Sequence, residues 1–561
     1  MPVLVALLAI GIGVVVFLVG EARKPEVVTI PSFSTALGTV HKAMPLRMVS
    51  FHRGRADKNL IKLAAQLGFN GVQFQIEGSN CGGVLDFAAR DAREHLIDYC
   101  HSLGMQVTVW VHELSDLPPY DSDDYLGDVS IDNQKLWSAL EERYEWMIGK
   151  VIPKVDGLVL TVVETQYKIS KDTPMQIKLV NMLDRICKEH GKYLIARTFV
   201  WEPAELDSVM ATVQQMPKDV VVMSKAVPQD WQMRGGNAKE IGAVGEHQQI
   251  VEFDALGEYF LHNCVANCMV DLLKQQFDYA ASKNAQGICV RVDRYDDNLL
   301  FEPSEVNLWT LGLLAAGSTD STDEIWRRWA TAHYGEKAAP GVIEALKPTS
   351  QVVAEMLSIG PFTFADTRYY PYDSGSATAS YLLPDGNLLS YNWEMWKWDD
   401  SYYPTYLKAR AGEASFTREI AGQKAAALKL ADECLAKLEK VKGELNATEY
   451  EILHARLLSN KVQLQYRAPM AMAALHIRQY VDTLGRRDAA SAAIALNSYN
   501  ADLLELNRVA DDIAAAGEPQ KLHYHGKDWK IGAPDIGPVI SDSGVLKEWA
   551  ELAKERPNVQ R

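Results

Sequence analysis

The chain lacks the sequence features by which metal-binding and nucleic-acid-binding proteins are usually recognised. Its seven cysteines are scattered, and none forms a Cys-x-x-Cys pair or stands with histidines at the spacing of a zinc site. It has no long run of Lys or Arg, and its formal net charge is −16, so neither nucleic acid nor an acidic membrane surface is an expected partner. We therefore expect no metal and no cofactor, and we expect the cysteines to act as small buried hydrophobic residues.

The remaining composition is that of an ordinary globular protein. Hydrophobic residues make up 47% of the 561 residues and charged residues 23%. A chain of this length is expected to form two or three domains with full cores.

A long apolar run stands near the N-terminus. The segment 3–20 is uncharged and has 18 residues, the lower limit for a membrane-spanning helix, and it also suits the core of a signal peptide. Arg23 and Lys24 follow it, which under the positive-inside rule would favour a cytoplasmic C-terminal side. We interpret 1–22 as a signal peptide or membrane anchor and 23–44 as a linker. The protein is therefore expected to be exported and to be periplasmic, extracellular or membrane-anchored, because the site chemistry below suits an enzyme that degrades a polymer.

From residue 46 onward, strand-like apolar runs alternate with helical stretches. The predicted strands are 48–52, 71–76, 106–111, 158–163, 193–200, 220–223, 249–253 and 287–292. The predicted helices are 57–67, 86–103, 132–150, 173–190, 203–215 and 265–283. The connection 232–246, between the sixth and seventh strands, has no helical pattern. This alternation predicts an α/β fold with a (β/α)8 barrel over residues 45–315.

The rest of the chain, 316–561, is rich in helical patterns. Amphipathic runs of Ala, Leu, Glu and Lys extend over 411–442, 449–484 and 487–515, which predicts a helical C-terminal domain. An irregular, aromatic-rich insertion is expected within it at 368–406.

Three carboxylates stand just past the ends of predicted strands, namely Glu164, Asp230 and Glu258. A carboxylate at the C-terminal end of a parallel barrel strand points into the active-site mouth, so the three can converge on one substrate. Taken singly, each could instead be a rim ion pair or a helix cap. Together they predict a glycosidase site, because carboxylate pairs hydrolyse glycosidic bonds.

Other charged and aromatic side chains stand at the same strand ends. Arg197 lies inside an apolar strand and needs a partner, either a barrel carboxylate or a substrate carboxylate. Lys225 can bind an anionic sugar group, and alternation puts Glu252 and Asp254 on one face of the seventh strand. Further candidates for substrate binding are Trp110, His112, Trp201 and Arg294. The two tryptophans could stack on a sugar ring or belong to the core.

The order of these motifs resembles glycoside hydrolase family 67, the α-glucuronidases, from about residue 46 to the helical region. The segments that carry the resemblance are Asp156-Gly157-Leu…Val163-Glu164-Thr165-Gln166, Arg197-Thr-Phe-Val-Trp201, Lys225-Ala-Val-Pro228-Gln-Asp230 and Glu252-Phe-Asp-Ala-Leu-Gly-Glu258-Tyr259. The resemblance implies an inverting mechanism, with Glu164 as the general acid and with Asp230 and Glu258 positioning and deprotonating the attacking water. It also implies that Arg197 helps to bind the uronic acid.

The chain departs from the family pattern in two places. It shows no counterpart of the family's N-terminal β-sandwich, and Leu160 stands where the family has a Lys four residues before its acid. On this alignment one cation near the uronic carboxylate is missing, and Leu160→Lys is expected to improve uronoside binding.

The leading hypothesis is an exo-acting, inverting glycoside hydrolase. It would remove α-linked glucuronic acid or a related sugar from an oligosaccharide or polysaccharide of plant or algal origin. One alternative is a retaining glycosidase with Glu164 as acid/base and Glu252 as nucleophile. The other is a non-catalytic, membrane-tethered glycan-binding protein. The sequence leaves the oligomeric state open.

Overall fold

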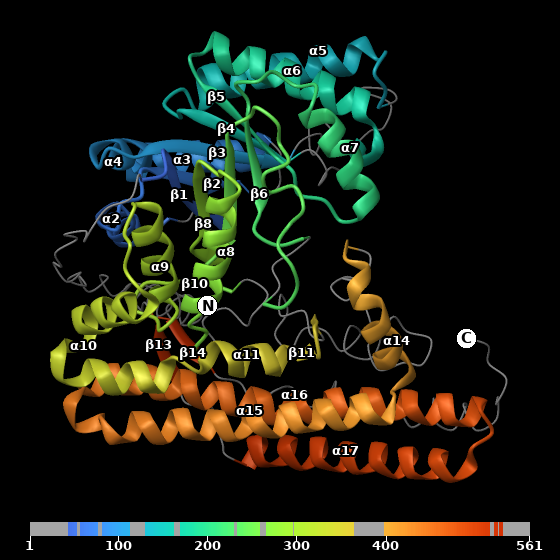
Figure 1. Cartoon of the computed structure of the whole chain (residues 1–561). Coiled ribbons are helices and arrows are strands. Elements are labelled where there is room, and N and C mark those ends of the chain that lie inside the picture. Colours follow the sequence, from blue (N-terminus) through green and yellow to red (C-terminus); the bar gives the residue numbers. More distant parts are fainter. Residues whose placement is uncertain are drawn as a thin grey trace, which may run out of the picture.

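The computed structural model describes residues 43–52, 56–76, 81–112, 129–161, 169–228, 233–257, 265–294, 297–363, 398–515, 521–524 and 527–530. Eight parallel strands close into a barrel in chain order, with β8 paired to β1 (Figure 1). The strands are β1 Leu46–Phe51, β2 Gly71–Gln75, β3 Gln106–His112, β4 Gly157–Thr161, β5 Tyr193–Arg197, β6 Val221–Lys225, β7 Gln249–Asp254 and β8 Gly287–Arg291. The prediction of a (β/α)8 barrel is confirmed.

Helices surround this barrel. They are α2 Lys58–Gln66, α3 Cys81–Glu94, α4 Leu96–Ser102, α5 Gln134–Trp146, α6 Thr173–Glu189, α7 Pro203–Val213, α8 Val270–Ser282 and α9 Glu305–Ala315. Side-chain caps begin several of them: the carboxylates of Asp57 and Asp172 and the amide oxygen of Asn133 accept backbone N–H bonds of the first turn. As predicted, the connection between β6 and β7 contains no helix in its described parts, 226–228 and 233–248.

The predicted helix 86–103 is divided in two. His95 has a φ of 53°, in the left-handed region, and this residue separates α3 from α4. The segment 86–103 contains no glycine or proline to mark the break, which explains why one continuous helix was predicted.

Alternation along the strands separates the barrel interior from the layer between strands and helices. The interior apolar cluster consists of Met48, Trp110, Val159, Ile195, Val221, Met223, Ile250 and Cys289. Neighbouring strand residues, such as Leu158 and Leu160, belong instead to the core beneath the surrounding helices. Gly287 permits the close approach of β8 to β1, because a Cβ atom there would collide with the carbonyl oxygen of Leu46.

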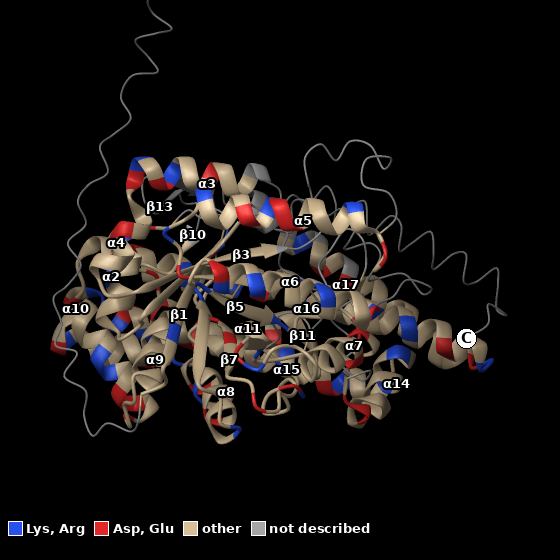
Figure 2. Cartoon of the chain, turned by 90° about the horizontal axis from the view of Figure 1, so that it is seen from above, with Lys and Arg blue, Asp and Glu red and all other residues tan. Residues whose placement is uncertain are grey.

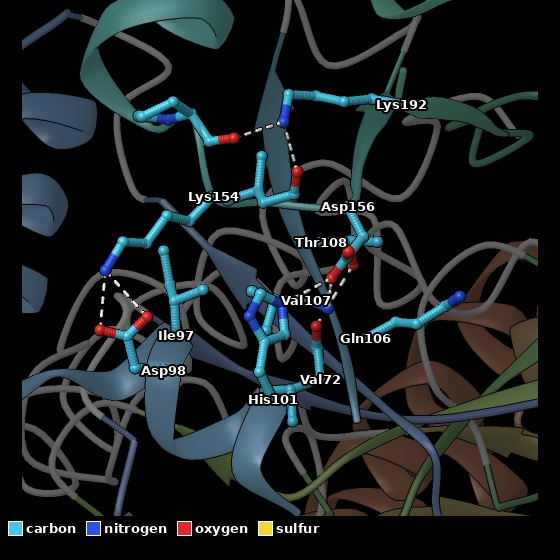
Figure 3. A network of polar contacts seen from close by, with 12 residues as sticks. Val72, Ile97, Asp98, His101, Gln106, Val107, Thr108, Lys154, Asp156 and Lys192 are labelled. Carbon is cyan, nitrogen blue, oxygen red and sulfur yellow. Dashed lines mark hydrogen bonds and ion pairs between the residues drawn. The ribbon is translucent and has the colours of Figure 1, made fainter. Parts of the chain in front are cut away.

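Polar contacts tie the strands together at the N-terminal end of the barrel (Figure 3). Asp156, which precedes β4, accepts a 2.7 Å hydrogen bond from the backbone of Val107 in β3 and lies 3.0 Å from Nε2 of His101 in α4. Lys192, which precedes β5, donates a 2.7 Å bond to the carbonyl of Pro153. In parallel barrels this end serves stability, whereas the opposite end carries the chemistry.

The C-terminal region is helical. Its helices are α10 Thr322–Leu346, α11 Thr349–Leu357, α14 Tyr403–Ala411, α15 Ala414–Lys440, α16 Ala447–Gly485 and α17 Ala489–Ala515. The last three lie side by side as long antiparallel helices (Figure 1). Two short hairpins accompany them, β11 Ser358–Ile359 with β12 Phe362–Thr363, and β13 Lys521–Tyr524 with β14 Lys527–Lys530. The helix α14 covers the last residues of the stretch predicted to be irregular, and residues 368–397 lie outside the described part.

Charges of both signs are spread over the helices. Viewed from above, Lys and Arg are interspersed with Asp and Glu (Figure 2). Among the described residues, no helix combines the length and apolarity that a bilayer crossing requires. The apolar segment 3–20 lies outside this part of the chain.

Buried polar contacts join the barrel to the helical region. Glu302, in the connection from β8 to α9, accepts two hydrogen bonds from Arg456 of α16, at 2.6 and 2.7 Å. Glu305, fully buried in α9, accepts bonds from Trp309 at 3.0 Å and from the backbone of Phe301 at 2.8 Å, and lies 2.7 Å from Nε2 of His333 in α10. The two regions therefore share one core.

We predict that the His333–Glu305 pair makes stability depend on pH. Burial alone would lower the pKa of His333, but the charge of Glu305 and its hydrogen bond more than offset this, so the net shift is upward. A raised folded-state pKa adds stability that is fully present below the unfolded value of about 6.5 and is lost as the pH rises through the folded value. His333→Phe should therefore lower the melting temperature by a few degrees more at about pH 6 than at about pH 9. Thermal unfolding of both proteins at the two pH values measures this, and a pH-independent difference would contradict it.

Candidate active site

A ring of polar side chains lies at the C-terminal end of the barrel interior. Each member follows an interior apolar residue by two positions on its strand. Its side chain therefore also points into the barrel interior, and it lies one layer nearer the mouth. These pairs are Ile195 and Arg197, Met223 and Lys225, Ile250 and Glu252, and Cys289 and Arg291. The register places Lys225 beside Glu252 and Asp254 beside Arg291. Alternation in four strands therefore builds a charged floor over an apolar barrel.

A buried ion pair lies at the centre of this floor. The Nε of Arg197 donates to Oε2 of Glu252 at 2.7 Å, and Nη2 of Arg291 lies 3.7 Å from Oε1. Arg197 is 2% exposed, Glu252 0% and Arg291 4%. The first reading of Arg197, an ion pair with a barrel carboxylate, is thus confirmed, and the carboxylate is Glu252.

Aromatic rings support the cations. The guanidinium carbons of Arg197 and Arg291 lie 4.4 and 5.6 Å from the centroid of the Trp110 ring, and Nε1 of Trp110 donates to Oγ1 of Thr161 at 2.6 Å. Lys225 Nζ lies 4.1 Å from the Phe199 ring centroid. Trp110 is therefore a buried platform for two guanidinium groups. This arrangement favours the core reading of Trp110 over direct stacking on a sugar.

Trp201 has a different setting. Its ring meets that of Phe199 edge-on at 4.6 Å, and its side chain is partly exposed. It remains a candidate for contact with a sugar.

Two aspartates order the starts of rim loops. Asp254 Oδ1 accepts backbone bonds from Leu256 at 3.1 Å and Gly257 at 3.0 Å, which forms an Asx turn directly after β7. Asp293 Oδ1 accepts a 2.5 Å bond from the backbone of His52 and so joins the ends of β8 and β1.

The three predicted catalytic carboxylates, Glu164, Asp230 and Glu258, lie outside the described residues. They follow β4, β6 and β7 in the chain, and these strands end at the same rim of the barrel. Their convergence remains a prediction. His112 ends β3, but its side chain also lies outside the described part. Arg294 is described, partly exposed in β9 Asp293–Arg294, which pairs with β10 Asp297–Asn298.

The expectation about Leu160 is wrong. Leu160 is fully buried in the core between strands and helices, and Val159 and Thr161 beside it are the β4 residues of the interior. A lysine at 160 would be placed in an apolar layer and not in the mouth. The alignment by spacing missed the strict alternation of the strand. Leu160 therefore gives no sign of a cation lost from the site.

Sequence reasoning did not select Arg291, Asp293 or Thr161 as site residues. Arg291 and Asp293 carried a usable signal, because they alternate at the end of the eighth strand. Thr161 carried none, because a lone threonine in an apolar run is ordinary.

The described cysteines, Cys100, Cys187, Cys268, Cys289 and Cys434, are all buried and unpaired. For Cys289, directly beneath the ion pair, burial and then the charge of Glu252 raise the pKa of the thiol well above its usual value. It therefore stays neutral. Within the described ranges, no three His, Cys, Asp or Glu side chains stand close enough to hold a metal ion.

Comparisons with known proteins support the fold. No family model and no curated protein matches the chain. A solved family GH138 enzyme that targets pectin rhamnogalacturonan II is 11% identical, with a TM-score of 0.58 over 92% of this chain and 69% of that one. At this identity the likeness shows a shared barrel architecture.

Two weaker structural matches were also found. A family GH115 4-O-methyl-α-glucuronidase with specificity for decorated arabinogalactans is 12% identical, with a TM-score of 0.42 over 83% of this chain and 59% of that one. A GH84 structure is 11% identical, also with a TM-score of 0.42, over 91% of this chain and 77% of that one. Membership of family 67 is not shown by any of these comparisons.

We predict that Arg197 and Glu252 are energetically coupled. Arg197→Met leaves a buried carboxylate without its closest cation, so the free energy of unfolding should fall by about 3–5 kcal/mol. Adding Glu252→Gln removes that charge, so the double variant should lose less than the sum of the single variants, by about 0.5–3 kcal/mol. Urea unfolding of the four proteins gives the coupling energy. Strict additivity would mean that the pair contributes nothing specific to the barrel.

Proposed function

We propose that the protein is a glycoside hydrolase that removes an acidic sugar, an α-glucuronosyl or related residue, from a plant or algal glycan. The observation that carries the proposal is the convergence of three cations, Arg197, Lys225 and Arg291, with Glu252 at the C-terminal end of a (β/α)8 barrel. This end of the fold carries the active sites of barrel enzymes. Guanidinium groups match the planar geometry of a substrate carboxylate.

The proposed chemistry uses the carboxylates of the rim. Glu164 acts as general acid toward the leaving oxygen, while Asp230 and Glu258 position and deprotonate a water on the opposite face of the sugar. An inverting enzyme of this kind needs a carboxylate separation of roughly 6.5–9.5 Å to hold that water. Asp254 supports the arrangement, because its turn fixes the chain directly before Glu258.

The environment of Glu252 speaks against the retaining alternative. A nucleophile must attack the anomeric carbon with a free oxygen, but the two oxygens of Glu252 face Arg197 at 2.7 Å and Arg291 at 3.7 Å. The pairing also holds the carboxylate in place and reduces its capacity to attack. Glu252 is better suited to orient the cations than to form a covalent intermediate.

The substrate and location are proposed from two further observations. The GH138 enzyme of similar fold targets a pectin, which agrees with a plant glycan as substrate. Export remains part of the proposal because of the apolar segment 3–20, and so does exo action on the end of a glycan.

The experiment that tests the proposal is product analysis by NMR on a panel of aryl glycosides and uronic-acid-bearing oligosaccharides. We expect release of an acidic sugar with inverted anomeric configuration. The matched control is each uronoside against its methyl ester, which removes the charge and keeps the ring. Losing charge-assisted bonds of about 1.5–3 kcal/mol each should reduce kcat/KM on the ester by roughly 10–100-fold.

Other outcomes separate the alternatives. Retention of configuration would replace the inverting mechanism. Equal rates on acid and ester would remove the acidic-substrate assignment. Binding of oligosaccharides without any turnover would support a glycan-binding protein.

We further predict that Glu164→Gln lowers kcat by roughly 10²–10⁴, the usual contribution of a general acid, because the amide cannot give its proton to the leaving group. Substrates with very good leaving groups should be affected less, since they need little protonation. Steady-state kinetics on aryl glycosides of graded leaving-group pKa measure this. A uniform loss across the series would assign Glu164 another role.

A further inference from the structure

The connection from β6 to β7 is held at its base and at its outer edge. Ala238 donates a 3.1 Å backbone bond to Ala226 and closes the loop at its base. Further out, Nη1 of Arg234 donates to the carbonyl of Gly360 at 2.6 Å, and Nη2 donates to Oε1 of Glu355 in α11 at 2.5 Å. The helical region therefore holds this loop at Arg234, four residues after Asp230 in the chain.

The partner of Arg234 is itself fixed. Lys424 of α15 is fully enclosed and donates hydrogen bonds to the carbonyl oxygens of Glu355 and Ser358. These bonds hold the end of α11 and the start of β11 against the long helix. Arg234 therefore binds to a rigid part of the helical region.

The connection from β7 to α8 is held in the same way. Asn460 of α16 accepts a 2.8 Å bond from the backbone N–H of Ala266 and donates a 2.9 Å bond to the carbonyl of the same residue. Asn307 of α9 donates to the carbonyls of Ala255 and Asn267, both at 2.9 Å, and so joins the two ends of this loop. Glu258 lies between those ends in the chain.

Such contacts are strong constraints because they are buried. Asn307 and Asn460 are 0% and 1% exposed, and a peptide group that loses its partner at such a site bears the full desolvation cost. Apolar packing alone could bury a long β-to-α connection without fixing the position of its backbone. Two asparagines that bond its backbone instead define where each end lies.

We propose that Arg234 and Asn460 are positioning residues, through which the helical region holds the two rim loops that carry Asp230 and Glu258. The inference rests on the proposed function, since it assigns these carboxylates to the water-activating side of the reaction. The helical region then acts on the site by holding these two loops. Small displacements of reacting groups are costly, about 10²-fold in rate for 1 Å.

The test uses Arg234→Met and Asn460→Leu in the full-length protein. Both replacements keep the approximate side-chain volume and remove the hydrogen bonds. The control is Arg328→Met, which breaks a similarly enclosed ion pair with Asp320, 2.6 Å long, formed by residues of neither loop. Arg234→Lys serves as the conservative variant, because it can keep one charge-assisted bond to Glu355.

We expect kcat to fall roughly 10–100-fold in the two test variants, with KM changed less than about threefold, at a temperature well below the melting temperature of every variant. Arg234→Lys should recover part of the loss. Amide hydrogen exchange, followed by mass spectrometry, should accelerate within 226–238 in Arg234→Met and within 255–269 in Asn460→Leu, and in neither segment in the control.

The outcomes are separable. Unchanged exchange in both segments, or unchanged kcat in variants of an active wild type, overturns the positioning role. A wild type without turnover on any substrate defeats the proposed function and the catalytic part of this inference, while the exchange measurement still decides whether the loops are held.

Discussion

A carboxylate with no access to solvent organises the mouth of this barrel. Glu252 lies between Arg197 and Arg291, and both guanidinium groups rest on the face of Trp110. A buried charge is costly unless its partners satisfy it, so the carboxylate fixes the direction of both arginines. Below this level the interior is apolar, with Ile195 and Cys289 under the ion pair. The level at which apolar residues give way to charged ones therefore sets the depth of the candidate site.

Backbone hydrogen bonds connect this ion pair to the rim of the barrel. The carbonyl of Glu252 accepts a bond from Ala226, the first residue after β6, and Asp254, two positions on, forms the turn that leads to Glu258. Further along the chain, Asn307 of α9 and Asn460 of the helical region bond the backbone of the loop after β7. In the loop after β6, Arg234 donates to Gly360 and Glu355 of the helical region. Of the carboxylates assigned to catalysis, Glu258 follows β7, which carries Glu252 of the ion pair, and Asp230 follows β6, whose next residue, Ala226, bonds the Glu252 carbonyl. The loops after these two strands are also held from outside.

The parts of this structure that sequence reasoning recovered are those with a local signal. Apolar runs and their alternation identified all eight strands, and the inward direction of Arg197, Lys225 and Glu252 followed from their place at strand ends. The partner of Arg197 did not follow, because Glu252 is 55 residues away and only the closure of the barrel brings the two together. The break at His95 also had little signal, since no glycine or proline stands within 86–103 to mark it. The Leu160 error came from aligning a motif by spacing without asking which face of the strand each position occupies.

The role of charge in this site is better tested by changing the charge of the substrate than by replacing Arg197. Its guanidinium bonds Glu252 and also lies at the floor of the mouth, so under the proposed function one side chain supports the barrel and attracts an acidic sugar. Any substitution at this position changes both properties, because the loss of the cation leaves a buried carboxylate that reorganises the floor. A change in the charge of the substrate alters only the second property and leaves the ion pair intact. Substrate specificity is therefore best measured with substrates of different charge on the unaltered protein. Variants of Arg197 then report how the ion pair stabilises the barrel.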